Sequence, residues 1–348
     1  MTERNTPPAR HQSWELAQMQ ALPLTQKISM TKRRIREWYD AFEGQVYVSF
    51  SGGKDSTVLL HIVRSMYPDV PAVFCDTGLE YPEIREFVKT FENVEWLKPK
   101  MNFREVIRTC GYPVISKEVS QVIREARVGL RKCDGTYQYR LDQLNGERRN
   151  ADGSISKYNK AKYKYLLDAP YLISEECCKI MKKDPAKRYE KESGRRAIIG
   201  TMAQESMLRK QRWMRYGCNA YEDHKRPIST PLAFWTEQDV LEYLVRYAVP
   251  FCSVYGDIIG VLADGAALTA DELRPMSQTC GIPEDTKLKT TGAQRTGCMF
   301  CCLGLSQDPE RFLRMKATHP TQYAWCMKPV EEGGLGLDEV LNFIHVPH

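Results

Sequence analysis

Two periods of apolar residues alternate along this chain. Short, mainly apolar runs predict strands at 46–50, 70–75, 94–97 and 197–199. Segments whose apolar residues recur three and four positions apart predict helices at 55–66, 82–91, 175–192 and 236–247, with shorter helical pieces near 103–109 and 117–127. Strands that alternate with helices in this way indicate a parallel sheet flanked by helices, which is the α/β fold class.

A glycine-containing loop joins the first predicted strand to its helix, in the sequence Ser51-Gly-Gly-Lys-Asp-Ser56. Two glycines let the backbone turn tightly and bring N–H groups toward an anion, while the next helix directs its positive end there. Lys54 adds a mobile cation. A bare Ser-Gly-Gly triplet also occurs in ordinary strand-to-helix turns, but the whole pattern predicts a phosphate-binding loop. Its members are Ser51, Gly52, Gly53, Lys54, Asp55 and Ser56.

Two further segments follow predicted strands. Asp76-Thr77-Gly78 comes after the strand at 70–75, and Gly200 comes after the strand at 197–199. Because ligands bind at the carboxyl ends of parallel strands, we expect both segments beside the glycine loop and in contact with a nucleotide. Asp76 would contact the nucleotide or Mg²⁺, although it could instead only cap a turn.

Three charged residues are the candidates for catalysis. Lys54 and Asp55 belong to the glycine loop, and Arg209 follows Glu205-Ser206 after a strand end. Arg209 could be a surface helix charge, but its place after a strand end favours a contact with phosphate or sulfate.

Composition narrows the class of protein. A chain of 348 residues with 42% apolar content can bury the core of one large domain or two smaller ones. It contains no run of about 18 apolar residues, and its first residues lack the apolar stretch of a secretory signal. We therefore expect a cytoplasmic protein without a membrane partner. Lys and Arg (50) exceed Asp and Glu (44), which favours anionic ligands.

Residues 129–165 differ from their surroundings, because they hold nine Lys or Arg, four Asp or Glu and five Tyr. Tyrosines interleaved with cations suit a surface that contacts a nucleic-acid backbone and stacks on bases. The same composition also suits a solvated β-hairpin. We treat the segment as a basic insertion.

Twelve cysteines in a cytoplasmic chain indicate metal ligation, catalysis or packing rather than a disulfide framework. The spacing of Cys298-Met-Phe-Cys301 allows two thiolates to reach zinc or an iron–sulfur cluster, or to form a redox disulfide. The adjacent pair Cys177-Cys178 favours a cluster. One tetrahedral ion rarely takes neighbouring cysteines, whereas a cubane cluster has separated iron corners.

On these residues the chain resembles the adenylylsulfate and phosphoadenylylsulfate (PAPS) reductase family of the PP-loop ATP pyrophosphatase superfamily, over most of residues 46–302. The motifs are Ser51-Gly-Gly-Lys-Asp-Ser56, Val73-Phe-Cys-Asp-Thr-Gly78, Cys177-Cys178, Ile198-Ile-Gly200 with Arg209, and Thr296-Gly-Cys-Met-Phe-Cys301. The resemblance implies a Rossmann-like parallel sheet of the adenine nucleotide alpha hydrolase-like type, with a C-terminal iron–sulfur and helical region.

The adenylylsulfate branch of that family also implies a [4Fe–4S] cluster. Its ligands here would be Cys177, Cys178, Cys298 and Cys301. Whether three or all four bind stays open, and Cys302 is an alternative to Cys301 or a sulfur carrier.

The resemblance implies ATP and Mg²⁺ as ligands. Reductases of the family carry a catalytic cysteine in a Glu-Cys-Gly motif near the C-terminus, and residues 341–348 contain none. Relatives without that motif include the sulfurtransferase of DNA phosphorothioation and cluster-dependent tRNA thiolation enzymes. We therefore expect an enzyme that adenylates an acceptor, releases pyrophosphate and supports sulfur transfer. The acceptor could be a nucleic acid contacted through residues 129–165.

Two alternatives stay open. The chain could be a sulfonucleotide reductase whose missing thiol comes from a partner protein or from Cys326. It could instead be a non-catalytic nucleotide-sensing regulator. A sulfur donor or an electron-donor protein is an expected partner, and the residues leave room for a homo-oligomer.

These expectations divide the chain into three parts. Residues 1–44 would form an N-terminal arm and helix, and residues 45–255 the nucleotide-binding α/β domain that carries the basic insertion. Residues 256–348 would hold a loop excursion over 256–290, the Cys-x-x-Cys segment and C-terminal helices.

Overall fold

The chain folds into two compact units in the computed structural model, which describes residues 9–221, 226–279, 281–283, 285–305 and 308–348. The first unit comprises residues up to Asp76, Glu80–Leu97 and Ala186–Gly297. The second comprises Thr77–Leu79, Lys98–Pro185 and Cys298–His348. The boundaries of these two units differ from those expected after residues 44 and 255. The division of the chain into three domains stays a prediction. Part of the expected arm, residues 1–8, lies outside the described residues.

A six-stranded sheet forms the centre of the first unit, in the order β3-β2-β1-β5-β7-β6. All neighbours are parallel except the antiparallel pair β6 and β7. The strands are β1 (Val46–Ser49), β2 (Ala72–Cys75), β3 (Val94–Leu97), β5 (Arg196–Ile199), β6 (Asn219–Ala220) and β7 (Ile228–Ser229). The chain runs from β1 to one side through β2 and β3, and returns on the other side at β5. The topological switch point, where ligands bind in such sheets, is therefore the carboxyl end of β1.

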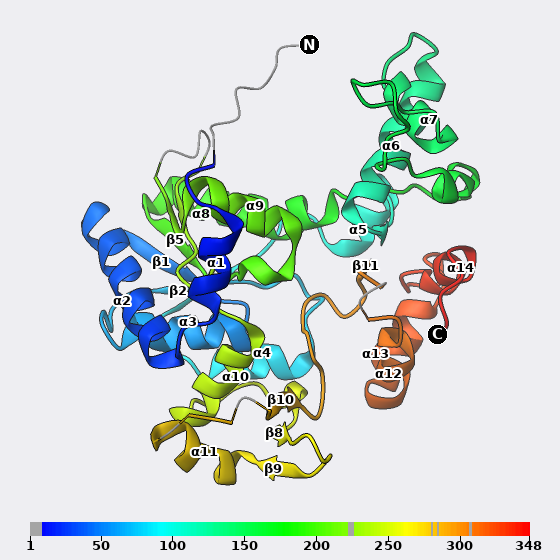
Figure 1. Cartoon of the computed structure of the whole chain (residues 1–348). Coiled ribbons are helices and arrows are strands. Elements are labelled where there is room, and N and C mark those ends of the chain that lie inside the picture. The colour runs from blue at the N-terminus through cyan, green and yellow to red at the C-terminus, as the bar shows by residue number, and fades with distance from the viewer. Residues whose placement is uncertain (1–8, 222–225, 280, 284, 306–307) are drawn as a thin grey trace. The chain divides into compact units, whose positions relative to one another are not determined.

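Helices flank this sheet (Figure 1). They are α1 (Ser13–Gln20), α2 (Leu24–Ala41), α3 (Lys54–Arg64), α4 (Pro82–Lys89), α8 (Asp184–Ser193), α9 (Met207–Tyr216) and α10 (Glu237–Arg246), with 3-10 turns η3 (Ala203–Glu205) and η4 (Ser253–Tyr255). Buried Tyr47, Val73 and Ala197 on β1, β2 and β5 form one core cluster. The mixed α/β fold with a parallel sheet agrees with the sequence pattern.

Residues 256–290 are not the expected loop excursion. They form β8 (Ile258–Val261), β9 (Ala267–Thr269), α11 (Ala270–Thr279) and β10 (Lys287–Thr290), with the strands in an antiparallel sheet of order β10-β8-β9. A Cβ on Gly260 would lie 2.8 Å from Thr286 Cγ2 and 2.9 Å from Leu273 Cδ2. The expectation was wrong because glycine here allows close packing of a small layer rather than marking a loop.

The second unit is mainly helical. Its helices are α5 (Phe103–Thr109), α6 (Lys117–Lys132), α7 (Gln138–Asn145), the 3-10 helix η1 (Ala161–Asp168), the π-helix η2 (Lys179–Lys183), α12 (Arg311–Thr318), α13 (Pro320–Met327) and α14 (Leu337–Phe343). Two short strands, β4 (Val114–Ile115) and β11 (Cys302–Leu303), pair in parallel.

The basic insertion at 129–165 contains the end of α6, α7 and the start of η1, and not a β-hairpin. The one isolated bridge described within it joins Arg149 to Ile155. Gly146 takes φ 80° and ends α7, so the turn signal there caps a helix. Arg140 Nε lies 2.6 Å from Glu125 Oε2 and fastens α7 to α6. The hairpin alternative was wrong for the segment as a whole, because Gly146 ends a helix and the Asp152-Gly153 turn is enclosed by only that single bridge.

The other predicted elements are confirmed within a few residues. The helix predicted at 175–192 spans residues 177–193, and its residues Lys179–Lys183 form the π-helix η2, which continues as α8. Within the described part of the chain, no helix is both long and apolar enough to span a membrane.

Candidate functional site

The glycine loop closes on itself at the carboxyl end of β1. Ser51 N donates to Ser56 Oγ at 3.1 Å, and Ser56 Oγ donates to Gly53 O at 2.9 Å. Gly52 has φ +71°, and a Cβ there would lie 2.9 Å from Ile84 Cγ2 and from Val88 Cγ2 on α4. Only glycine fits this position, because both its conformation and its surroundings exclude a side chain. The helix α3 then begins at Lys54.

A pocket of about 270 Å³ opens at this loop within the first unit. Its lining residues are Ser51, Gly53, Lys54, Asp55, Met202, Gln204, Glu205, Arg209, Glu237, Tyr255, Arg295 and Thr296. The structure thus brings together Lys54, Asp55 and Arg209, the three predicted catalytic residues. It adds Glu237, Tyr255, Arg295 and Thr296, none of which the sequence analysis assigned to the nucleotide site.

Lys54 is buried and held from several sides. Its Nζ donates to Gln294 O at 2.7 Å and lies 3.1 Å from Glu237 Oε1. The same ammonium sits 5.2 Å from the centroid of the Tyr255 ring. Tyr255 also accepts from Lys54 N at 3.2 Å and exchanges a 2.7 Å hydrogen bond with Thr296. Glu237 was recognisable from the sequence only as a first-turn acid of α10.

Asp55 contributes an unsatisfied acceptor. Its Oδ1 is buried and has no hydrogen-bond partner in the described part of the chain. Burial raises the pKa of this carboxyl, while the charge of Lys54 opposes the shift. A buried oxygen without a donor favours a ligand that brings a cation or an N–H group to it.

Arg209 and Arg295 complete the charges of the pocket. Arg209 Nη1 pairs with Glu205 Oε2, and Arg295 Nη2 lies 3.8 Å from Glu205 Oε1. Burial, together with the charge of Arg295, lowers the pKa of Arg209. Counting Asp55 and Glu237 as well, the pocket has three cations and three carboxylates.

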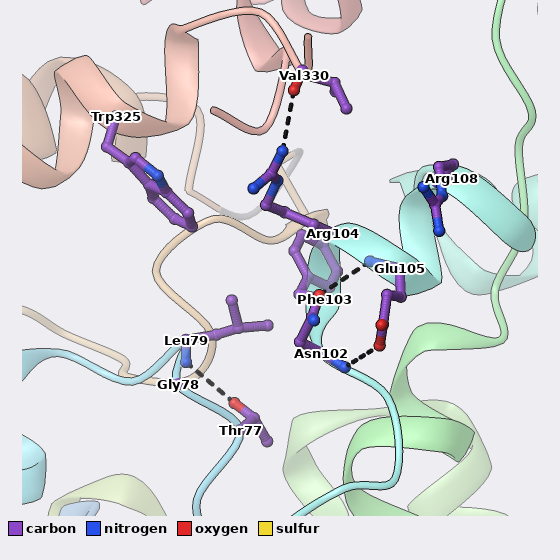
Figure 2. Close-up of a pocket in the computed structure, with 10 residues that line it drawn as sticks. All are labelled: Thr77, Gly78, Leu79, Asn102, Phe103, Arg104, Glu105, Arg108, Trp325 and Val330. Carbon is purple, nitrogen blue, oxygen red and sulfur yellow. Dashed lines mark hydrogen bonds between the residues drawn. The ribbon is translucent and has the colours of Figure 1, made fainter. Parts of the chain in front are cut away.

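The remaining predicted nucleotide residues fall in different places. A Cβ on Gly200 would lie 3.0 Å from Asp55 O, so the end of β5 closely approaches the loop. Asp76 is buried at the end of β2, where its Oδ2 accepts from Arg85 Nη2 at 2.9 Å. Thr77 and Gly78 belong to the second unit and line a separate pocket there, drawn in Figure 2.

Residues 111–114 of the second unit contact both segments that carry the four predicted cluster ligands. Tyr112 bridges Ile173, just before Cys177-Cys178, while Val114 pairs with Cys302, just after Cys301. A Cβ on Gly111 would lie 2.4 Å from the Leu172 carbonyl, so glycine lets these backbones meet. Segments 120 residues apart in sequence (298 − 178) thereby reach one place.

The four thiols line one pocket, together with apolar side chains and Lys182. Its members are Leu79, Phe103, Pro113, Cys177, Cys178, Met181, Lys182, Cys298, Phe300 and Cys301. Cys177 Sγ donates to Cys178 Sγ at 3.9 Å. This bond, with the charges of Lys117, Lys182 and Lys183, lowers the pKa of Cys178. The same bond raises the pKa of Cys177. Because the thiolate is the form of cysteine that ligates metal, the lowered pKa of Cys178 favours ligation.

Among the described residues, no group of three or more His, Cys, Asp or Glu side chains is arranged to hold a metal ion. This result applies to one ion, whose ligands must converge on a point. A cubane cluster takes one cysteine at each of four separate irons, so its ligands need only surround a common space. Four cysteines around one apolar pocket fit that requirement in their chemistry.

Two other cysteines do not reach this pocket. Cys302 is fully buried on β11, and burial raises the pKa of its thiol. Cys326 on α13 is also fully buried, and burial raises its pKa to about 12. Neither side chain is placed to act as an exposed thiol.

A comparison with known families decides the relationship. The phosphoadenosine phosphosulfate reductase domain matches residues 45–121 and 99–302, which is most of the chain. The chain belongs to this family.

Individual relatives are distant. The chain is 23% identical to the phosphoadenosine 5'-phosphosulfate reductase of Alkalilimnicola ehrlichii, covering 72% of this chain and 85% of that protein. It is 24% identical to the adenosine 5'-phosphosulfate reductase of Staphylococcus haemolyticus, covering 64% and 70%. It is 37% identical to an uncharacterized protein of Methanocaldococcus jannaschii, but the match covers 23% of this chain and only 21% of that protein.

A crystal structure of phosphoadenylyl-sulfate (PAPS) reductase from Candida auris, in complex with phosphate, is a more distant neighbour. It aligns with a TM-score of 0.35 and 15% identity, over 70% of this chain and 90% of that one.

Proposed function

We propose that this PAPS reductase family member binds ATP in the pocket of the first unit, adenylates an acceptor oxygen and releases pyrophosphate. Sulfur transfer to the adenylated acceptor would follow, supported by a [4Fe–4S] cluster in the second unit. The observation that carries the proposal is the pocket at the switch point of the sheet, where Lys54, Arg209 and Arg295 meet the glycine loop.

The charges of the pocket suit phosphate chemistry. An acceptor oxygen would attack the α-phosphorus, the bond to the bridging β-phosphate oxygen would break, and pyrophosphate would leave with that electron pair. The acceptor proton would pass to solvent. Lys54, Arg209 and Arg295 would offset the charge that grows on the leaving group. Asp55, with its unsatisfied Oδ1, would hold the Mg²⁺ that accompanies the nucleotide.

Cys177, Cys178, Cys298 and Cys301 would hold the cluster, which would supply electrons or a sulfur-binding iron when bound. Phe103, Met181 and Phe300 line the same pocket and would keep water away from the sulfurs. Lys182 and Lys183 would offset the negative charge of a thiolate-bound cluster, as they already lower the pKa of Cys178.

A nucleic acid is the acceptor that the basic insertion favours. Three cations there lie over tyrosine rings: Arg140 over Tyr139 at 4.7 Å, Lys157 over Tyr158 at 5.5 Å, and Lys162 over Tyr163 at 4.8 Å. Tyr139 and Tyr158 are 42% and 51% exposed. Exposed rings beside cations suit contacts with bases and phosphates of an unpaired strand.

Sulfonucleotide reduction is the second candidate, favoured by the names of the two reductases that this chain matches over most of their length. In that case the first pocket would hold the charged end of a sulfonucleotide. The attacking thiol would come from a partner protein, because Cys326 is fully buried.

Product analysis separates the two reactions. We expect ATP-dependent release of pyrophosphate that is lost in Lys54→Ala and retained in Lys89→Ala, an exposed lysine of α4 that serves as the control. Release of sulfite from a sulfonucleotide, without pyrophosphate from ATP, would support reduction instead. Nucleotide binding with neither product would support a nucleotide-sensing regulator.

Anaerobic purification with iron and acid-labile sulfide analysis tests the cluster. We expect about four iron and four sulfide per chain, lost in the double variant Cys298→Ala and Cys301→Ala. The matched control is Cys133→Ala, which removes an exposed cysteine of the same unit. Zinc, or no metal in the wild type, would contradict the cluster.

A further inference from the structure

A separate pocket of about 440 Å³ lies in the second unit (Figure 2). The indole of Trp325 on α13 and the side chains of Arg104 and Arg108 on α5 line it, with Leu79 and Phe103 as apolar wall. This volume is in the range of pockets that take one small ligand. None of the reactions above uses it.

Trp325 presents a fixed aromatic ring to the pocket. The side chain is 39% exposed, although it is anchored on two sides. Its Nε1 donates to Gly333 O at 3.1 Å, and its ring packs against the edge of Phe300 at 5.4 Å between centroids. An anchored ring with accessible surface can stack on a flat ligand at little entropic cost.

Two guanidinium groups lie on the same helix face, since Arg104 and Arg108 are four residues apart. Arg104 Nη2 donates to Val330 O at 3.0 Å, which holds that side chain over the pocket. Among the described residues, neither arginine forms an ion pair with a carboxylate. Glu105 lines the same pocket, and its Oε2 accepts from Asn102 N at 2.9 Å at the start of α5. Two cations without anionic partners favour a phosphate.

We propose that this pocket binds one unpaired nucleotide of a nucleic-acid strand, with its base stacked on Trp325 and its phosphate paired with Arg104 and Arg108. That this strand is the acceptor of the adenylation reaction rests on the proposed function, whereas the binding itself does not. A strand, rather than a free mononucleotide, is favoured because the same unit carries the exposed tyrosine and cation pairs of residues 129–165.

The test is the binding of a dye-labelled short single-stranded oligonucleotide, without ATP, measured by fluorescence anisotropy over a series of salt concentrations. Trp325→Leu should weaken binding on the order of tenfold and leave the salt dependence unchanged. Trp325→Phe should restore most of the affinity. The double variant Arg104→Gln and Arg108→Gln should reduce the slope of log affinity against log salt by about 0.7, the value for one phosphate of a single strand.

The controls are Trp14→Leu, which removes a 60% exposed tryptophan of the first unit, and Arg33→Gln on α2. Both should bind like the wild type. Wild-type affinity and slope in the Trp325 and double-arginine variants would overturn the proposal. So would AMP competing as well as the strand at equal nucleotide concentration, since the pocket would then take a free nucleotide. This binding assay contains no ATP, so its result does not depend on the proposed reaction. A lack of pyrophosphate release in the separate ATP assay would contradict that reaction and leave the binding result unchanged.

Discussion

At the residue scale, Gly52 sets the shape of the anion-binding loop. Replacing it with alanine forces a side chain into a left-handed backbone and into contact with Ile84 and Val88. We expect Gly52→Ala to lower the free energy of unfolding by about 1–2 kcal/mol for the backbone. The crowding should cost a further 1–3 kcal/mol, roughly. Urea denaturation measures both.

Gly194 provides the matched control in the same unit. It has φ +73°, but a Cβ there meets nothing within 4 Å. Gly194→Ala should therefore show the backbone cost alone. Equal losses in the two variants would mean that α4 moves aside and that the loop is not held by this contact.

Asp55 should make stability depend on pH. Burial raises its pKa above the ordinary value of 3.8, so folding favours the protonated carboxyl. That contribution is complete below the ordinary pKa and is lost as pH rises through the raised one. In the ligand-free protein, the unfolding free energy of Asp55→Asn minus that of the wild type should therefore increase from acid to neutral pH. A constant difference across the titration would contradict the raised pKa.

At the scale of elements, one buried ion pair joins α2 to α10. Lys27 Nζ lies 2.7 Å from Asp239 Oδ2, and both residues are buried. Asp239 Oδ2 also accepts from Thr236 N at 2.6 Å, and this hydrogen bond is part of the N-terminal cap of α10. Asp239→Ala should cost about 3–5 kcal/mol, because it leaves a buried ammonium without its counter-ion.

Lys27→Met should cost less than Asp239→Ala, because Asp239 keeps its bonds to Thr236. Lys89→Met is the control. Its partner Glu86 is 2.6 Å away, but both side chains are largely exposed, so the loss should stay within about 1 kcal/mol. Thermal or urea unfolding of the three variants gives the order. Equal effects of the two buried substitutions would contradict the double role of Asp239.

The elements also show which signals a sequence carries. The strands around Val46 and Val94 were predictable because apolar period and turn residues are local. Residues 256–290 were not, because the packing around Gly260 depends on Leu273 of α11 and on Thr286 just before β10, which lie 13 and 26 residues further along the chain. The sequence alone does not distinguish a glycine that permits close packing from a glycine in a loop.

At the scale of the whole chain, thiol reactivity should follow burial. Cys133 is exposed and should react first with a maleimide at mildly alkaline pH. Cys302 and Cys326 are fully buried with raised pKa values, so they should react only after unfolding. Mass spectrometry of native and urea-treated protein locates the labels, and Cys133→Ser removes the fast one. Rapid native labelling of Cys326 would restore it as a candidate thiol.

The candidate site, like the strands and helices, was predictable only in part from the sequence. Lys54, Asp55 and Arg209 line one pocket because each follows a strand of a single parallel sheet, and the alternation of strands and helices predicts that sheet. Arg295 and Tyr255 come from the segment around the small antiparallel layer, which carried no motif. These two residues reach the pocket through tertiary contacts, which the periodicity of apolar residues along the chain does not predict.

The equal number of positive and negative groups around Lys54 means that nucleotide entry is an exchange reaction. A phosphate that binds Lys54 and Arg209 competes with their ion pairs to Glu237 and Glu205, and any carboxylate that it displaces lacks a counter-ion. A divalent cation entering with the nucleotide would compensate them. We expect isothermal titration to show pyrophosphate and Mg²⁺ strengthening each other's binding, with each alone binding weakly. Such thermodynamic linkage would make the metal complex, and not the bare anion, the species that the empty protein selects.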